Sequence, residues 1–150
     1  MKSIISLLAI ALTLVSCAKK NAEEQAAEDD AIIKQYIADN SLTALSTSSG
    51  LHYVIDVAGT GASCSSQSNV RVAYTGYFTD GEIFDQSSST GIEFGLQQVI
   101  QGWTEGIPYF KEGGSGKLLV PSALAYGKNG TSGIPPNSVL IFDIELHEVL

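Results

Sequence analysis

Apolar and polar residues alternate along several short segments in the C-terminal two thirds of the chain. Residues 51–57 read LHYVIDV, in which Leu51, Tyr53, Ile55 and Val57 alternate with His52, Val54 and Asp56. This alternation predicts a half-buried strand with the histidine on its outer face. Residues 70–78 show the same alternation and predict a second strand. Because successive side chains of a strand point to opposite faces, each of these segments has one face suited to a core.

Further strands are predicted between turn signals. Gly81 follows Thr and Asp in a sequence typical of a hairpin turn, where glycine adopts positive φ. The remaining strands are expected over residues 82–86, 92–95, 117–120 and 138–150. In the last of them the inward side chains are expected to be Leu140, Phe142, Ile144 and Leu146.

A helical period interrupts this pattern at residues 99–107, the segment that holds the one tryptophan, Trp103. Its apolar residues recur at the spacing of one helix face. Gly102 and Gly106 leave the helix slim, so other backbone can approach it closely. Five or six strands and one short central helix define an α+β fold, a twisted antiparallel sheet wrapped around the helix.

The N-terminal third differs in composition. Residues 1–16 contain Lys2 and then a mostly apolar run, which is typical of a secretory signal peptide and too short for a membrane span. The residues that end at Cys17 resemble the lipobox of bacterial lipoproteins. That resemblance implies lipidation of Cys17; the alternative is an ordinary cleaved signal with an incidental cysteine.

Residues 17–49 are expected to form a charged helical stalk, helical over 23–39, followed by a Ser/Thr-rich linker from residue 41. The stalk could dock on the domain or act as a spacer, and its short apolar stripe favours these roles over helix pairing. The domain itself is expected to cover residues 50–150.

Composition narrows the function. The net charge of −8 argues against a nucleic-acid partner, which requires a basic surface. Cys64 lies in a Ser-rich loop and is expected to be an exposed free thiol. Neither a phosphate-binding loop, a set of metal-ligand spacings nor a catalytic nucleophile is recognisable, so no metal and no cofactor are expected.

Four segments together resemble the FK506-binding-protein (FKBP) type of peptidyl-prolyl cis-trans isomerase. They read VAYTGYFTDGEIFD (72–85), VIQGWTEGI (99–107), VPSALAYG (120–127) and IPPNSVLIFDIEL (134–146). They occur in family order, and the similarity covers residues 50–150. The resemblance implies the family's sheet-on-helix fold and an aromatic pocket that binds proline.

On the matching positions, the resemblance implies a site in two parts. The catalytic set is Tyr74, Phe84, Asp85, Trp103, Tyr126 and Phe142, with Trp103 as the floor under the proline ring. The substrate-binding set is Ile92, Phe94, Val99, Ile100 and Ile134, where the backbone N–H of Ile100 would donate to a substrate carbonyl and Ile134 would close the far side. An aromatic residue is common in the family where Ile92 falls, so the chain lacks one ring there.

The resulting hypothesis is an isomerase that assists the folding of exported, proline-containing polypeptides. The alternatives are a non-catalytic peptide binder or holdase chaperone that uses the same pocket, and a purely structural envelope lipoprotein. We expect a monomer in the cell envelope, lipid-anchored at Cys17 to the outer membrane and facing the periplasm. FK506-like macrolides are possible ligands by the same resemblance.

Overall fold

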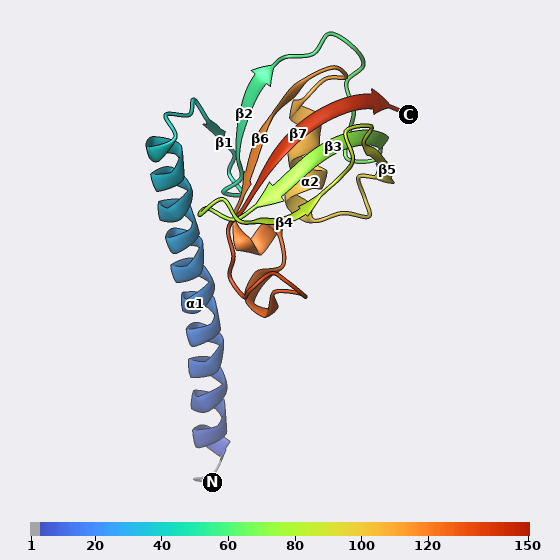
Figure 1. Cartoon of the computed structure of the whole chain (residues 1–150). Coiled ribbons are helices and arrows are strands. Elements are labelled where there is room, and N and C mark those ends of the chain that lie inside the picture. Colours follow the sequence, from blue (N-terminus) through green and yellow to red (C-terminus); the bar gives the residue numbers. More distant parts are fainter. Residues whose placement is uncertain (1–3) are drawn as a thin grey trace.

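The structure, a computed structural model, describes the backbone of residues 4–150 and the side chains of residues 21–150. Within this range one antiparallel sheet curves around a short helix, and a long N-terminal helix lies on its other side (Figure 1). The helices are α1 (Ile4–Asp39) and α2 (Gln101–Gly106), with 3₁₀ turns η1 (Ile107–Tyr109), η2 (Ser122–Leu124) and η3 (Gly127–Asn129). The strands are β1 (Leu45–Ser46), β2 (His52–Val57), β3 (Asn69–Tyr77), β4 (Ile83–Gln86), β5 (Ile92–Gly95), β6 (Ser115–Val120) and β7 (Leu140–Val149).

The strand order is β1-β2-β6-β7-β3-β4, and β5 pairs with β3 beyond the point where β4 ends. The predicted α+β fold is therefore confirmed, and the strand expected over 92–95 is β5. Gly81 has a φ of 91° in the predicted hairpin turn between β3 and β4. β7 lies between β3 and β6, so its central residues are paired on both sides.

The inner face of the sheet and α2 enclose the main core. The four residues expected to point inward from β7 are buried there with Val70 and Val72 of β3. Gly102 and Gly106 let α2 approach β6, as predicted. A Cβ on Gly102 would lie 2.4 Å from Cγ1 of Val120, so a side chain at this position would force the helix away from the sheet.

A second core on the outer face corrects the prediction for His52. The last turns of α1 bring Ile33, which is fully buried, against Val54, Leu119 and Ile141. His52 shares this face with Val54 and is only 6% exposed. The first half of β2 is therefore buried on both faces, because α1 covers the side that the alternation assigned to solvent.

The predicted linker also contributes to the sheet. Leu45 and Ser46 form β1 and pair with Tyr53 and His52 of β2. The linker prediction is wrong at these residues, because an edge strand offers free backbone groups to any extended segment beside it.

Cys64, predicted to be an exposed free thiol, is only partly exposed. Its side chain packs against the main core, and burial raises the pKa of its thiol.

The helix predicted over 23–39 is the C-terminal half of α1, and it docks on the domain. The predicted signal peptide and Cys17 lie outside the residues whose side chains are described. Among the described residues, no helix is both long and apolar enough to cross a membrane.

Candidate active site

Trp103 lies on the inner side of α2 and forms the base of an aromatic cluster. Its side chain is 6% exposed. The ring of Tyr74 from β3 meets it edge-on, with 4.8 Å between the ring centroids, and the ring of Phe142 from β7 does so at 5.1 Å. Phe94 of β5 lies 5.3 Å from it in a tilted arrangement. Three strands distant in sequence therefore place rings against one indole, in geometries that aromatic pairs prefer.

Phe84 extends the cluster on the β4 side. Its ring centroid lies 5.6 Å from that of Phe142 and 5.1 Å from that of Phe78. Gly76, which the sequence did not single out, makes room for these rings. A Cβ on Gly76 would lie 2.7 Å from Cζ of Phe84 and 2.9 Å from Cε1 of Phe142.

A cavity of about 490 Å³ opens beside this cluster, within the range of small-ligand sites. All six residues predicted as catalytic line it, and so do Ile92, Phe94, Val99 and Ile100. Gln98 and Ala125 line it too and were missed. Each stands next to a predicted residue, but neither side chain is distinctive enough to be recognised in a sequence.

Ile134 does not line this cavity. It is 7% exposed and packs in the main core, while its backbone exchanges two hydrogen bonds with Thr131 in a tight turn. The position predicted to close the far side of the pocket is therefore a core position, because the turn directs this apolar side chain inward.

Polar groups stand at the rim of the cavity. The Tyr74 hydroxyl donates a hydrogen bond of 2.7 Å to Oδ2 of Asp85. Burial, together with this hydrogen bond, raises the pKa of Tyr74 further above the physiological range, where an ordinary phenol is already a neutral donor. Tyr126 is 41% exposed on the segment that follows η2.

The N-terminus of α2 supplies a further donor. Ile100 is the residue that precedes the helix, and its carbonyl accepts hydrogen bonds from the N–H groups of Trp103 and Thr104. Its own N–H makes no hydrogen bond to another described residue. The Trp103 Nε1 is the one buried side-chain polar atom of the described residues that lacks a partner. The cavity thus combines apolar walls with few and defined polar groups.

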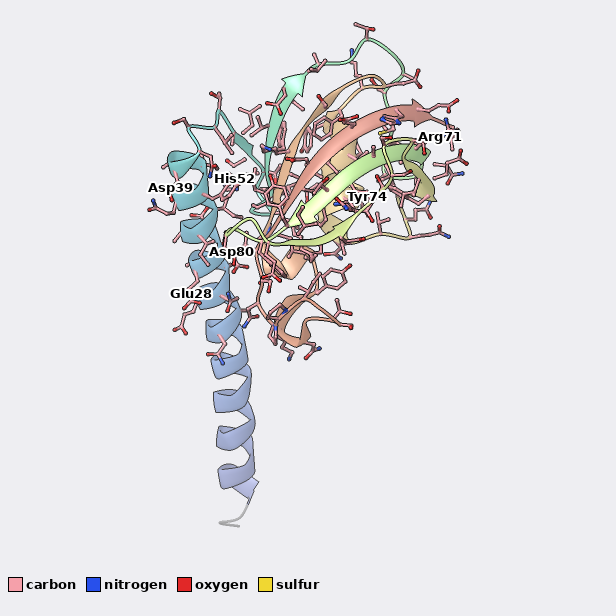
Figure 2. All side chains as sticks on the ribbon, in the orientation of Figure 1. Glu28, Asp39, His52, Arg71, Tyr74 and Asp80 are labelled. Atoms are coloured by element: carbon pink, nitrogen blue, oxygen red, sulfur yellow. The ribbon has the colours of Figure 1, made fainter. Side chains whose placement is uncertain are left out.

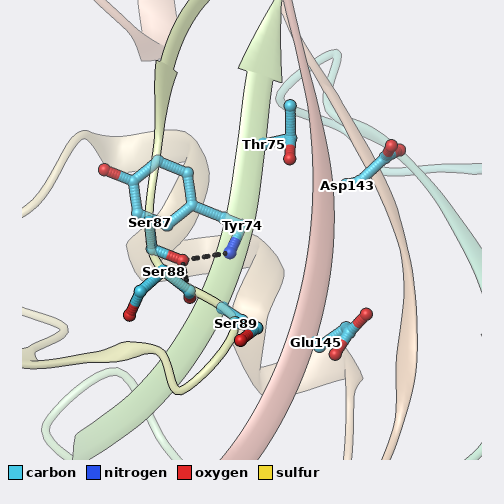
Figure 3. A pocket seen from close by; sticks show the side chains of 8 residues that line it. Tyr74, Thr75, Ser87, Ser88, Ser89, Asp143 and Glu145 are labelled. Atoms are coloured by element: carbon cyan, nitrogen blue, oxygen red, sulfur yellow. Dashed lines mark hydrogen bonds between the residues drawn. The ribbon is translucent and has the colours of Figure 1, made fainter.

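The outer side of β3 carries a separate, polar hollow of about 270 Å³ (Figure 3). Asp143 and Glu145 of β7 line it, and the Tyr74 ring extends away from them. The Ser87 hydroxyl accepts a 2.9 Å hydrogen bond from the Tyr74 N–H and donates one to the Ser88 carbonyl. Ser87 therefore fixes the backbone of Tyr74, whose ring serves the aromatic cavity on the other face; Figure 2 shows where Tyr74 lies in the whole molecule.

A curved antiparallel sheet that holds an aromatic cavity against a short central helix defines the class of FKBP-like domains. Residues 61–147 match the family described as FKBP-type peptidyl-prolyl cis-trans isomerase, and the chain belongs to this family. The resemblance found in the sequence is thereby confirmed.

Several curated proteins are similar in sequence to most of this chain. It is 43% identical over 132 residues to "FKBP-type peptidyl-prolyl cis-trans isomerase FkpA" of Aeromonas hydrophila. The aligned region covers 85% of this chain and 49% of that protein. The protein of the same name from Escherichia coli (strain K12) is 42% identical over 138 residues, with 89% and 51% covered. The chain spans about half the length of these curated relatives.

Solved structures support the same family. The crystal structure of FkpA from Escherichia coli matches with a TM-score of 0.73 and 40% identity, covering 96% of this chain and 70% of that chain. A peptidyl-prolyl cis-trans isomerase from Pseudomonas syringae pv. tomato matches with a TM-score of 0.71 and 31% identity, covering 85% and 94%.

Proposed function

We propose that this chain accelerates cis-trans rotation about X-Pro peptide bonds in polypeptide substrates. The observation that carries the proposal is the open cavity with Trp103 at its base, Tyr74, Phe84 and Phe142 as walls, and hydrogen-bond donors at its rim. Family membership supports it. A proline ring is an apolar disc that such a cavity accommodates.

The reaction suits a cavity without a nucleophile or metal. Rotation breaks no covalent bond, but it has a barrier of about 18–20 kcal/mol because amide resonance is lost. The twisted amide is less polar than the planar one, so an apolar cavity destabilises it less than the ground state. A 10⁴- to 10⁶-fold acceleration needs roughly 5–8 kcal/mol of such differential binding.

Each residue has a defined part in this proposal. Trp103 supports the proline ring, and the Ile100 N–H donates to a substrate carbonyl. The Tyr126 hydroxyl donates to another carbonyl from the opposite rim. Asp85 accepts from Tyr74 and so acts as a polar contact and not as a proton-transfer group.

The test is isomerisation of a short X-Pro peptide by the full chain. Trp103→Leu and Phe142→Ala are expected to lose most of the acceleration, because each removes a wall or the floor. Absence of acceleration by pure, folded wild-type protein would refute the proposal. A non-catalytic holdase would instead suppress the aggregation of an unfolded client without accelerating isomerisation of the X-Pro peptide.

We further propose that the substrates are exported polypeptides and that the chain is a monomeric envelope lipoprotein anchored through Cys17, facing the periplasm from the outer membrane. The signal-like run and lipobox-like ending of residues 1–17 support export and the lipid anchor, and the short apolar stripe of residues 23–39 supports a monomer. In cells, labelled palmitate is expected to enter the wild-type chain and not a Cys17→Ser variant. Membrane fractionation is then expected to recover the wild-type chain with the outer membrane. FK506 is proposed as a ligand of the same cavity and is expected to inhibit the peptide assay.

A further inference from the structure

Asp29 of α1 makes a buried contact with the segment that leads to Tyr126. Its Oδ2 accepts a hydrogen bond of 2.8 Å from the Ser122 N–H and one of 2.6 Å from the Ser122 hydroxyl. Oδ1 accepts a third, of 2.9 Å, from Nε2 of Gln25. The Asp29 side chain is 1% exposed, and 93 residues separate it from Ser122.

The contact satisfies a backbone group that the turn itself cannot satisfy. Ser122 is the first residue of η2, where N–H groups have no partner within the helical turn. The preceding residue is Pro121, and it provides no side-chain cap. The carboxylate of α1 supplies the missing acceptor, and hydrogen bonds to an ionised group are stronger than neutral ones.

Two further hydrogen bonds carry this constraint to the cavity. The N–H of Leu124 donates to the Pro121 carbonyl and that of Ala125 to the Ser122 carbonyl, both at 3.0 Å. Ala125 lines the aromatic cavity, and Tyr126 follows it directly. The segment from Ser122, which contacts Asp29, to Ala125 at the cavity is therefore one short hydrogen-bonded unit.

Close packing does not account for this attachment. A hollow of about 590 Å³ borders the contact, between Ala22 and Ala26 of α1 and the residues that follow Ser122, including Lys128. Figure 1 shows α1 passing beside this segment below the sheet. The apolar docking of α1 is made by Ile33 and the residues after it. Hydrogen bonds to Asp29 therefore fix the segment where packing is loose.

We infer that Asp29 is a positioning residue for X-Pro isomerisation: from α1, it holds Ser122 so that Ala125 and Tyr126 stand correctly at the cavity. The inference rests on the proposed isomerase function. It makes the stalk helix part of the active-site support, a role that neither its composition nor its amphipathic stripe indicates.

The test compares Asp29→Ala, Asp29→Asn and Glu28→Ala in the full chain. Asp29→Ala is expected to lower kcat/KM about tenfold, since displacement of a site by 1 Å can cost up to about 10²-fold. Asp29→Asn is expected to restore most of the loss, because an amide oxygen has two lone pairs for Ser122 and the Gln25 amide can turn over. Glu28→Ala changes the charge of α1 equally at an exposed position and is expected to match the wild type.

Amide hydrogen exchange supplies a readout that general destabilisation would not reproduce. In Asp29→Ala the amides of residues 122–125 are expected to exchange faster while those of β6 and β7 keep their wild-type rates. Equal acceleration throughout the sheet would overturn the inference, and so would an unchanged kcat/KM. If Asp29→Ala does not fold, Ser122→Ala, which deletes only the hydroxyl contact, decides by the same two measurements.

The two proposals fail differently. A wild-type chain without isomerase activity refutes the proposed function, and the positioning role with it. An active wild type, together with an Asp29→Ala chain of unchanged activity and unchanged exchange at residues 122–125, overturns the role of Asp29 alone.

Discussion

Replacing Gly76 by alanine is expected to deform the aromatic cavity from the sheet side. The new Cβ would lie 2.7 Å from Cζ of Phe84, whereas carbon atoms pack best at about 3.5 Å or more, so the ring must withdraw by about 0.8 Å. Phe142, at 2.9 Å, must move as well. Both rings are walls of the cavity, and each is packed against a further ring, so the displacement cannot be absorbed locally.

We expect Gly76→Ala to cost about 1–3 kcal/mol of stability, as overpacking does. Displaced walls are expected to lower kcat/KM on the order of tenfold, which corresponds to about 1.4 kcal/mol of transition-state stabilisation. Peptide isomerisation and thermal unfolding of the same samples measure both effects. Gly113→Ala is the control, because its φ of 81° makes alanine strained although no atom lies within 4 Å. A Gly76→Ala chain that loses stability like the control but keeps full kcat/KM would refute the role of these walls.

Three further expectations concern the rest of the molecule. Ile33→Ala is expected to lower the free energy of unfolding by about 2–5 kcal/mol, and Ile32→Ala, at a 41% exposed neighbour, by about 0.5 kcal/mol at most; equal urea midpoints would contradict the docking of α1. Burial and hydrogen bonds with Tyr36 and Asp143 raise the pKa of Tyr77, so its contribution to stability is fully present below the unfolded-state pKa of about 10 and is lost above it; Tyr77→Phe is expected to flatten this alkaline loss in urea titrations, and an equally steep loss would contradict it. Because burial raises the pKa of Cys64, a disulfide reagent is expected to label a Cys17→Ser chain much more slowly when folded than in urea, and equal rates would contradict this.

The sequence predicted those parts of the fold that local patterns determine. β5, the hairpin at Gly81 and the inward side of β7 follow from alternation and turn chemistry, which act over a few residues. The burial of His52 and the formation of β1 could not be predicted in the same way. Both depend on where α1 and the segment after it come to lie, and that is decided by contacts distant in sequence.

The same distinction holds for the candidate site. The aromatic residues were identifiable because four segments carry them in a recognisable order, and the structure brings them to one cavity. Gly76 and Asp29 were not identifiable. The first acts by lacking a side chain, and the second by reaching a residue 93 positions away. Ile134 was assigned to the pocket by resemblance alone, and the local turn places it in the core.

The central claim is that this cavity eases amide rotation through its shape and low polarity, without proton transfer by a side chain. The most direct test is kcat/KM of the wild-type chain for an X-Pro peptide in H₂O and in D₂O across the neutral pH range. We predict a solvent isotope ratio near unity and a flat pH profile. A ratio well above unity together with a bell-shaped profile, the signature of general acid–base catalysis, would contradict the account.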